Sequence, residues 1–164
     1  SEHSPGNVRV NVSGTTIRNS GNHGISVLND AVLTVERSTI VGSHVSGVLA
    51  YATGLNKVAR ASITDTTISG DVFYSGFGVW AFTSGDATAE ARMEVSRTTI
   101  TNVGMALRSE GALGVPRIRV GSSVLSGLQA WNTSGSAARI ASFGNNQMTA
   151  AGGGFTELEA VTLQ

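Results

Sequence analysis

The stretch TTIRNSGNHGISV, residues Thr15–Val27, opens with a motif that returns along the whole chain. Two polar residues followed by an apolar one recur as STI at Ser38, TTI at Thr66, TTI at Thr98 and SSV at Ser122, with a degraded copy, NQM, at Asn146. Successive copies lie 23, 28, 32, 24 and 24 residues apart. Self-similarity at such intervals indicates a repeat architecture, in which each unit packs against its neighbours.

Each triplet lies between two segments in which polar and apolar residues alternate. This period of two is typical of strands with one buried face. The segments before the triplets place apolar pairs on the inward face, namely Val10/Val12, Leu33/Val35, Ala61/Ile63, Met93/Val95 and Ile118/Val120. The segments after the triplets begin with a glycine, at Gly24, Gly47, Gly78, Gly104 and Gly127. We therefore expect a strand, a short strand around the triplet and a third strand in each copy.

One copy cannot bury its apolar face alone, whereas stacked copies bury a continuous core. The chain resembles the right-handed parallel β-helix repeat proteins of the pectate-lyase-like superfamily, whose copies read STI…G-(I/L). In that family a coil of the type SYGNN often closes the array, and SFGNN, Ser142–Asn146, stands in that place. The resemblance covers roughly residues 8–155.

The predicted fold is all-β: a single-domain right-handed parallel β-helix of about six coils with three short strands per coil. We expect 1–7 to be a polar lead, 8–151 to form the coils and 152–164 to be a capping segment. An antiparallel sandwich is the alternative, but its turns should recur about every 8–12 residues. Since the superfamily includes lyases, hydrolases, epimerases and adhesins, the resemblance implies no one activity.

The triplet itself is explained as part of the core. Its last residue points inward and forms one apolar stack of Ile17, Ile40, Ile68, Ile100, Val124 and Met148. Its first residue also points inward, at a corner, as Thr15, Ser38, Thr66, Thr98, Ser122 and Asn146. Because a buried hydroxyl needs a hydrogen-bond partner, we expect these side chains to bond to the neighbouring backbone or to each other.

Composition narrows the class of partner. The 164 residues include 11 basic and 11 acidic side chains, so a net charge of zero predicts no nucleic-acid partner. No apolar run reaches about 18 residues, so no membrane span is expected. The absence of cysteine fits an exported bacterial protein, whether secreted, periplasmic or at the cell surface. The chain starts at Ser1 without methionine, which indicates processing or excision from a longer protein.

The third strands carry an outward aromatic strip, whose predicted members are Leu49, Tyr51, Trp80, Phe82 and Trp131. Arg108 is their expected polar partner. Contiguous apolar patches on soluble proteins usually mark a contact. Two interpretations remain open. The strip contacts protein, such as a second copy, or its rings stack on the sugars of a polysaccharide while Arg108 holds a carboxylate.

The first strands carry a basic column at their first outward position, with Arg9, Arg60, Arg92 and Arg117 as members and Val32 and Ile140 at the remaining places. Four arginines in a row could line a groove for a polyanion such as an acidic polysaccharide. The alternative is a solvated face on which the arginine stems cover apolar surface.

Candidates for catalysis are confined to His23, His44 and Asp71, which should lie at one edge in consecutive coils. A glycosidase needs two carboxylates across a groove, but the strand-borne Glu36 and Glu94 are separated by an intervening coil. We expect no metal and no cofactor. The predicted function is a non-catalytic module for self-association or glycan contact, with a carbohydrate-active lyase or hydrolase as the alternative. An open strand edge at the N-terminal end, together with the strip, favours a homo-oligomer.

Overall fold

The computed structural model describes residues 8–70, 76–152 and 159–160. Within these residues the regular structure is all strand, with no helix. Strands of successive repeats pair in parallel, and the repeats stack as a β-solenoid of about five turns. The predicted all-β class and the stacking of parallel strands are therefore confirmed.

A seven-stranded sheet contains the first strand of each repeat. Its strands in spatial order are β1 (Val8–Ser13), β4 (Ala31–Glu36), β7 (Val58–Thr64), β10 (Glu90–Ser96), β12 (Val115–Gly121), β14 (Arg139–Ser142) and β16 (Glu159–Ala160). Pairing is in register throughout, so the inward positions of one strand lie directly over those of the next. The predicted inward residues Leu33, Val35, Ile63 and Met93 are at most 2% exposed.

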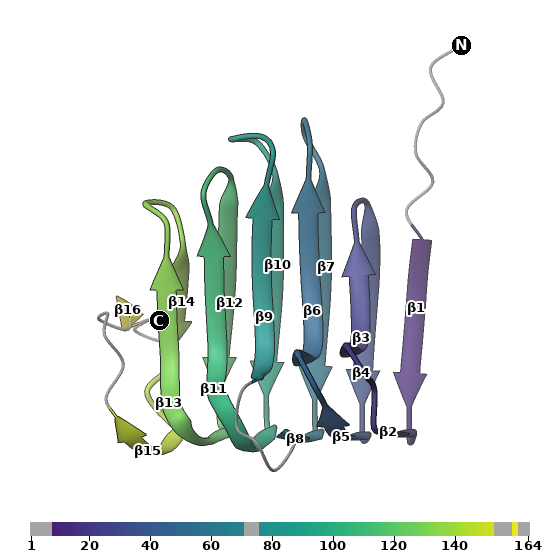
Figure 1. Ribbon diagram of the computed structural model, residues 1–164, viewed down its shortest axis with the longest axis vertical. Coiled ribbons are helices and arrows are strands. Elements are labelled where there is room, and N and C mark those ends of the chain that lie inside the picture. The colour runs from purple at the N-terminus through teal and green to yellow at the C-terminus, as the bar shows by residue number, and fades with distance from the viewer. Residues whose placement is uncertain (1–7, 71–75, 153–158, 161–164) are drawn as a thin grey trace.

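A nine-stranded sheet contains the other strands. The short corner strands are β2 (Thr16–Arg18), β5 (Thr39–Ser43) and β8 (Thr67–Gly70), and the third strands are β3 (His23–Leu28), β6 (Ser46–Thr53) and β9 (Phe77–Ser84). In later repeats the corner and third strands merge as β11 (Thr99–Gly111) and β13 (Val124–Ser134), followed by β15 (Gln147–Gly152). Figure 1 shows the third strands running opposite to the first strands behind them.

The corner hydroxyls after the first coil are buried and bond to backbone, whereas Thr15, predicted to point inward, is exposed. Ser38, Thr66, Thr98 and Ser123 are at most 4% exposed, and each donates to the carbonyl oxygen two residues earlier at 2.8–2.9 Å. The Ser123 hydroxyl also accepts the amide of Thr98 in the preceding coil at 3.2 Å. One side chain thus closes its own turn and joins two coils, which explains why a small hydroxyl residue recurs there.

The predicted register is wrong by one residue in the fifth coil. Ser123 rather than Ser122 occupies the corner, and Leu125 rather than Val124 continues the apolar stack beneath Ile100. The residue before each corner hydroxyl adopts the left-handed conformation, and Ser122 does so with φ of 51°. Ser122 therefore forms the turn, and Ser123 takes the corner position.

Glycine at the start of the third strand allows close packing of the next coil. A Cβ at Gly24, Gly47 or Gly78 would lie 2.3–2.5 Å from the Cγ2 atom of the isoleucine one coil on. The predicted glycine series is wrong after Gly78, because the register places Ala106 and Ala130 in these positions instead of Gly104 and Gly127. Those alanines are buried.

The motif SFGNN closes the last full coil through its two asparagines. Asn146 takes the corner position, where its Oδ1 accepts the Ser123 amide at 2.9 Å and its Nδ2 donates to the Val120 carbonyl at 3.1 Å. Asn145 forms two hydrogen bonds with Ser122. At the other end, Val8 and Val10 are 60% and 47% exposed on β1, although their equivalents in the next coil are largely buried.

Candidate functional site

An aromatic cluster, consisting of Tyr51, Phe77, Trp80 and Phe82, lies on the outer side of β6 and β9. The rings of Tyr51 and Phe82 stack with centroids 5.1 Å apart, and those of Trp80 and Phe82 stack at 5.2 Å. Phe77 meets Trp80 edge-on at 5.0 Å. The Tyr51 hydroxyl lies 2.8 Å from Ser84 Oγ, and this hydrogen bond lowers the pKa of Tyr51.

The rings of the cluster are largely occupied by contacts with each other. Phe82 stacks between Tyr51 and Trp80, and Trp80 is bounded by Phe77, Phe82 and the ring of His23 at 6.2 Å. The indole Nε1 of Trp80 is covered and has no hydrogen-bond partner. Leu49, in register with Trp80, is only 6% exposed. The cluster is therefore a compact apolar ridge.

Register separates Trp131 from the other members of the predicted strip. It pairs with Leu107, which pairs with Val79, so Trp131 belongs to an inward column and packs partly buried against the core. The expected outward placement of Trp131 is wrong because the glycine series misaligned the later third strands. Phe77 takes part in the cluster instead, and its place immediately before Gly78 was the available sequence signal.

Arg108 lies beside the cluster, in register with Trp80. Its Nε donates to Glu110 Oε2 at 3.2 Å and its Nη1 donates to Asn132 Oδ1 at 2.7 Å. The Arg108 side chain is only 18% exposed. Its charge is thus matched within the chain, which leaves little capacity to hold a carboxylate of a ligand.

The predicted catalytic residues are not brought together in the part of the chain that the structure describes. His23 lies on β3, where its Nδ1 is 2.7 Å from Ser46 Oγ and burial lowers its pKa. His44 is exposed and lines a separate hollow with Asn19, Ser20, Gly21 and Gly42. Asp71 lies outside the described residues. Across the described part of the chain, no group of three or more His, Asp or Glu side chains could hold a metal ion.

The carboxylates of the described residues are mostly engaged by cations. The described residues form six ion pairs with nitrogen–oxygen distances of at most 3.9 Å, namely Asp30–Lys57, Glu36–Arg37, Asp65–Arg97, Glu90–Arg92, Glu94–Arg119 and Glu110–Arg108. Five hollows on the surface of the described residues are each lined by at most one carboxylate. The arrangement therefore offers no pair of acids for glycoside hydrolysis in these hollows.

The basic column lies on the outer face of the seven-stranded sheet. Register aligns Arg60, Arg92, Arg117 and Arg139 on four consecutive strands. The residue that follows Arg117 in the column is therefore Arg139, and not Ile140 as predicted. Arg9 is separated from them by Val32. All five arginines are exposed.

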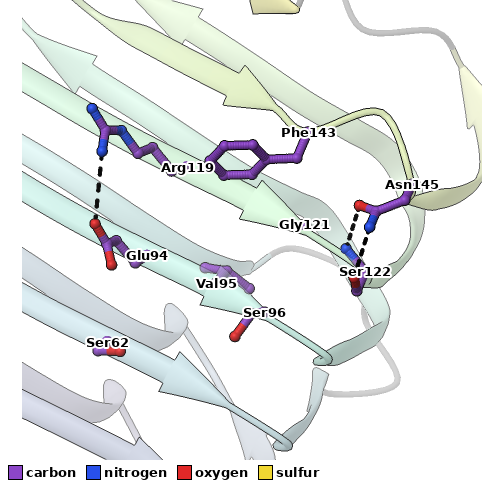
Figure 2. Close-up of a pocket in the computed structure, with 9 residues that line it drawn as sticks. All are labelled: Ser62, Glu94, Val95, Ser96, Arg119, Gly121, Ser122, Phe143 and Asn145. Carbon is purple, nitrogen blue, oxygen red and sulfur yellow. Dashed lines mark hydrogen bonds and ion pairs between the residues drawn. The ribbon is translucent and has the colours of Figure 1, made fainter. Parts of the chain in front are cut away.

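Three hollows on this face share lining residues, and together they are called the basic furrow. They measure about 270, 150 and 360 Å³ and share Glu94, while Arg92 and Arg119 each line two of them. The largest, drawn in Figure 2, ends at Phe143, whose ring lies beside the Arg119 side chain. Phe143 packs over Gly121, where a Cβ would lie 3.2 Å from its ring.

Comparison of the chain with protein-family models, with curated proteins and with solved structures finds no match. The architecture therefore rests on the structure and the repeat pattern. In the part of the chain that the structure describes, no helix has the length and apolar character needed to cross a bilayer.

Proposed function

We propose that this β-solenoid is a non-catalytic contact module that associates with a second copy of itself through the aromatic cluster. The observation that carries the proposal is the ring stack of Tyr51, Phe82 and Trp80, which forms an apolar ridge on an outer sheet face. Leu28 extends the ridge on β3, in register with Tyr51, and is 52% exposed. Apolar ridges of this kind on soluble proteins are typical of contact surfaces.

Protein contact is favoured over sugar contact by the orientation of the rings. A sugar stacks on an open ring face, whereas the faces of Phe82 and Trp80 are directed at neighbouring rings. Arg108 is already paired with Glu110 and Asn132. A partner that packs against partly buried rings and aliphatic side chains such as Leu28 suits this surface better than a pyranose.

We also infer that the chain belongs to the pectate-lyase-like superfamily, that its coil is right-handed and that it is exported from a bacterial cell. The STI…G repeat supports membership of the pectate-lyase-like superfamily, and parallel crossovers are right-handed in nearly all proteins, which supports a right-handed coil. The absence of cysteine supports export from a bacterial cell. A carbohydrate-active enzyme is the less supported alternative, since no described hollow is lined by two carboxylates.

Sedimentation and light scattering across a concentration series test the proposed contact. Wild-type protein should show a concentration-dependent dimer, and Leu28→Asp should shift it to monomer because a carboxylate would be buried at the ridge. Leu55→Asp is the matched control, since Leu55 is 66% exposed in the turn after β6, outside the ridge. A wild-type monomer at every concentration, or equal effects of both variants, would refute self-association through this ridge.

A further inference from the structure

The basic column places like charges directly opposite each other on neighbouring strands. Arg60, Arg92 and Arg117 are in register on β7, β10 and β12, and such strands lie about 4.8 Å apart. Like charges directly opposite each other in a sheet are destabilising. A bound anion removes this repulsion, because it supplies the negative charge that the column lacks. Anion binding would therefore explain why the arginines are placed opposite each other.

The arginines of the column differ in whether their guanidinium groups have a partner within the chain. Arg92 forms an ion pair with Glu90 on its own strand, whereas no acid partner of Arg60 or Arg117 exists among the described residues. Arg139 turns its guanidinium to the carbonyl oxygens of Ser136 and Ala138. The two arginines without an acid partner are therefore two strands apart, so their Cα atoms are separated by about 9.6 Å when one interstrand step is about 4.8 Å.

The furrow between these arginines has the character of a polymer site. Its three hollows share Glu94, and most of their lining residues come from β4, β7, β10 and β12. Arg119 faces Glu94 across a loose 3.9 Å contact in which both side chains are more than half exposed. Ser62 offers a hydroxyl, and Phe143 offers an apolar wall at one end (Figure 2).

We propose that the basic furrow binds a linear polysaccharide that carries one anionic group per disaccharide. Such a chain lies along the stack, with its anions on Arg60 and Arg117, its intervening neutral sugar over Arg92 and Glu94, and a further ring against Phe143. Arginine suits this role because its planar fork can bind a carboxylate or sulfate through two hydrogen bonds.

Two other polyanions match the furrow less well. A polymer with one anion per sugar would bring charges to the already paired Arg92 and to Glu94. A nucleic acid strand presents phosphates at shorter intervals, about 3.4 Å along each strand of a duplex.

Titration calorimetry tests the proposal with four probes of matched length. These are a hyaluronan oligosaccharide (one carboxylate per disaccharide), an oligogalacturonate (one per sugar), a neutral N-acetylglucosamine oligomer and an oligothymidylate. The hyaluronan oligosaccharide should bind most tightly, and the binding should weaken with added salt because exposed charges are screened. Tighter binding of any other probe, or no binding of the hyaluronan oligosaccharide, overturns the proposal.

Four single variants and a double variant locate the site. Arg60→Gln and Arg117→Gln should each weaken hyaluronan binding about fivefold, the upper end for an exposed ion pair, and the double variant about 25-fold if the effects add. Arg18→Gln, an exposed arginine on β2 outside the furrow, is the matched control and should leave affinity unchanged. Glu94→Gln should tighten binding, because it removes a negative charge from the furrow. Equal affinity of Arg18→Gln and the double variant, or weaker binding by Glu94→Gln, would contradict the assigned contacts.

Discussion

Replacing Gly78 by alanine tests why glycine begins the third strand in three coils and alanine in the next two. A Cβ at Gly78 would lie 2.3 Å from Ile100 Cγ2 and 2.7 Å from the Ala106 carbonyl oxygen. One coil later the register places Ala106 at the position of Gly78 and Leu125 at the position of Ile100. Leucine is not branched at Cβ and has no Cγ2, so the space needed by the alanine methyl is free.

The expected energies follow from this clash. Overpacking a core by one methyl destabilises the fold by about 1–3 kcal/mol, and Gly→Ala stabilises it by about 0.4–1 kcal/mol by restricting the unfolded chain. Gly78→Ala should therefore lower the free energy of unfolding by about 1 kcal/mol. Ile100→Leu alone should cost up to about 1.5 kcal/mol. Combined, the two should be less destabilising than their sum by about 1–2 kcal/mol, within the range measured for residues in contact.

Urea unfolding of the wild type, both single variants and the double variant measures this coupling from the transition midpoints. Ile68→Leu is the matched control for the second site, because Ile68 packs against Gly47 rather than Gly78. Its combination with Gly78→Ala should be additive within about 0.5 kcal/mol. Additivity of Gly78→Ala with Ile100→Leu would refute the explanation and assign the cost to the Ala106 carbonyl instead.

Three further predictions concern the corner, one histidine and the closing motif. Ser123→Ala should lower the free energy of unfolding by about 2–3 kcal/mol, because it leaves the buried Thr98 amide without its acceptor. Thr98→Val should lower it by about 1 kcal/mol. Urea midpoints of the two variants test this order. Burial lowers the pKa of His23 below 6.5, so the unfolded state binds more protons as pH falls past that value, and stability should fall from pH 7 to 5. His23→Asn should flatten this slope in unfolding curves at both pH values. Asn146→Ala should speed amide exchange at Ser123 by removing its acceptor.

The inward half of the fold was predictable because burial imposes a period of two. Ile40, Ile63 and Val95 were expected inside and are 0–2% exposed. The errors occurred where local sequence left the register ambiguous. Two adjacent serines, Ser122 and Ser123, both fit the corner, and the left-handed turn residue decided between them.

The outward sites were harder to predict, because no burial pattern fixes which outward residues become neighbours. A one-residue slip in a strand transfers side chains to the other face. The misaligned glycines thus placed Trp131 outside, although its register partner Leu107 is fully buried. Tyr51, Trp80 and Phe82 were grouped correctly because they lie on two adjacent strands before the misalignment.

The basic column shows how strand pairing separates the spacing of surface groups from their spacing in the sequence. Arg60, Arg92, Arg117 and Arg139 lie 32, 25 and 22 residues apart along the chain, yet they are in register on consecutive strands. Extra residues are absorbed by the turns, since an insertion of one residue within a strand would direct inward side chains to solvent. Surface groups on such a scaffold keep one regular interval of about 4.8 Å, while the turns vary freely. A ligand with a regular repeat is the kind of partner that this column can match, which is why the assigned occupant of the furrow is a polymer and not a single small molecule.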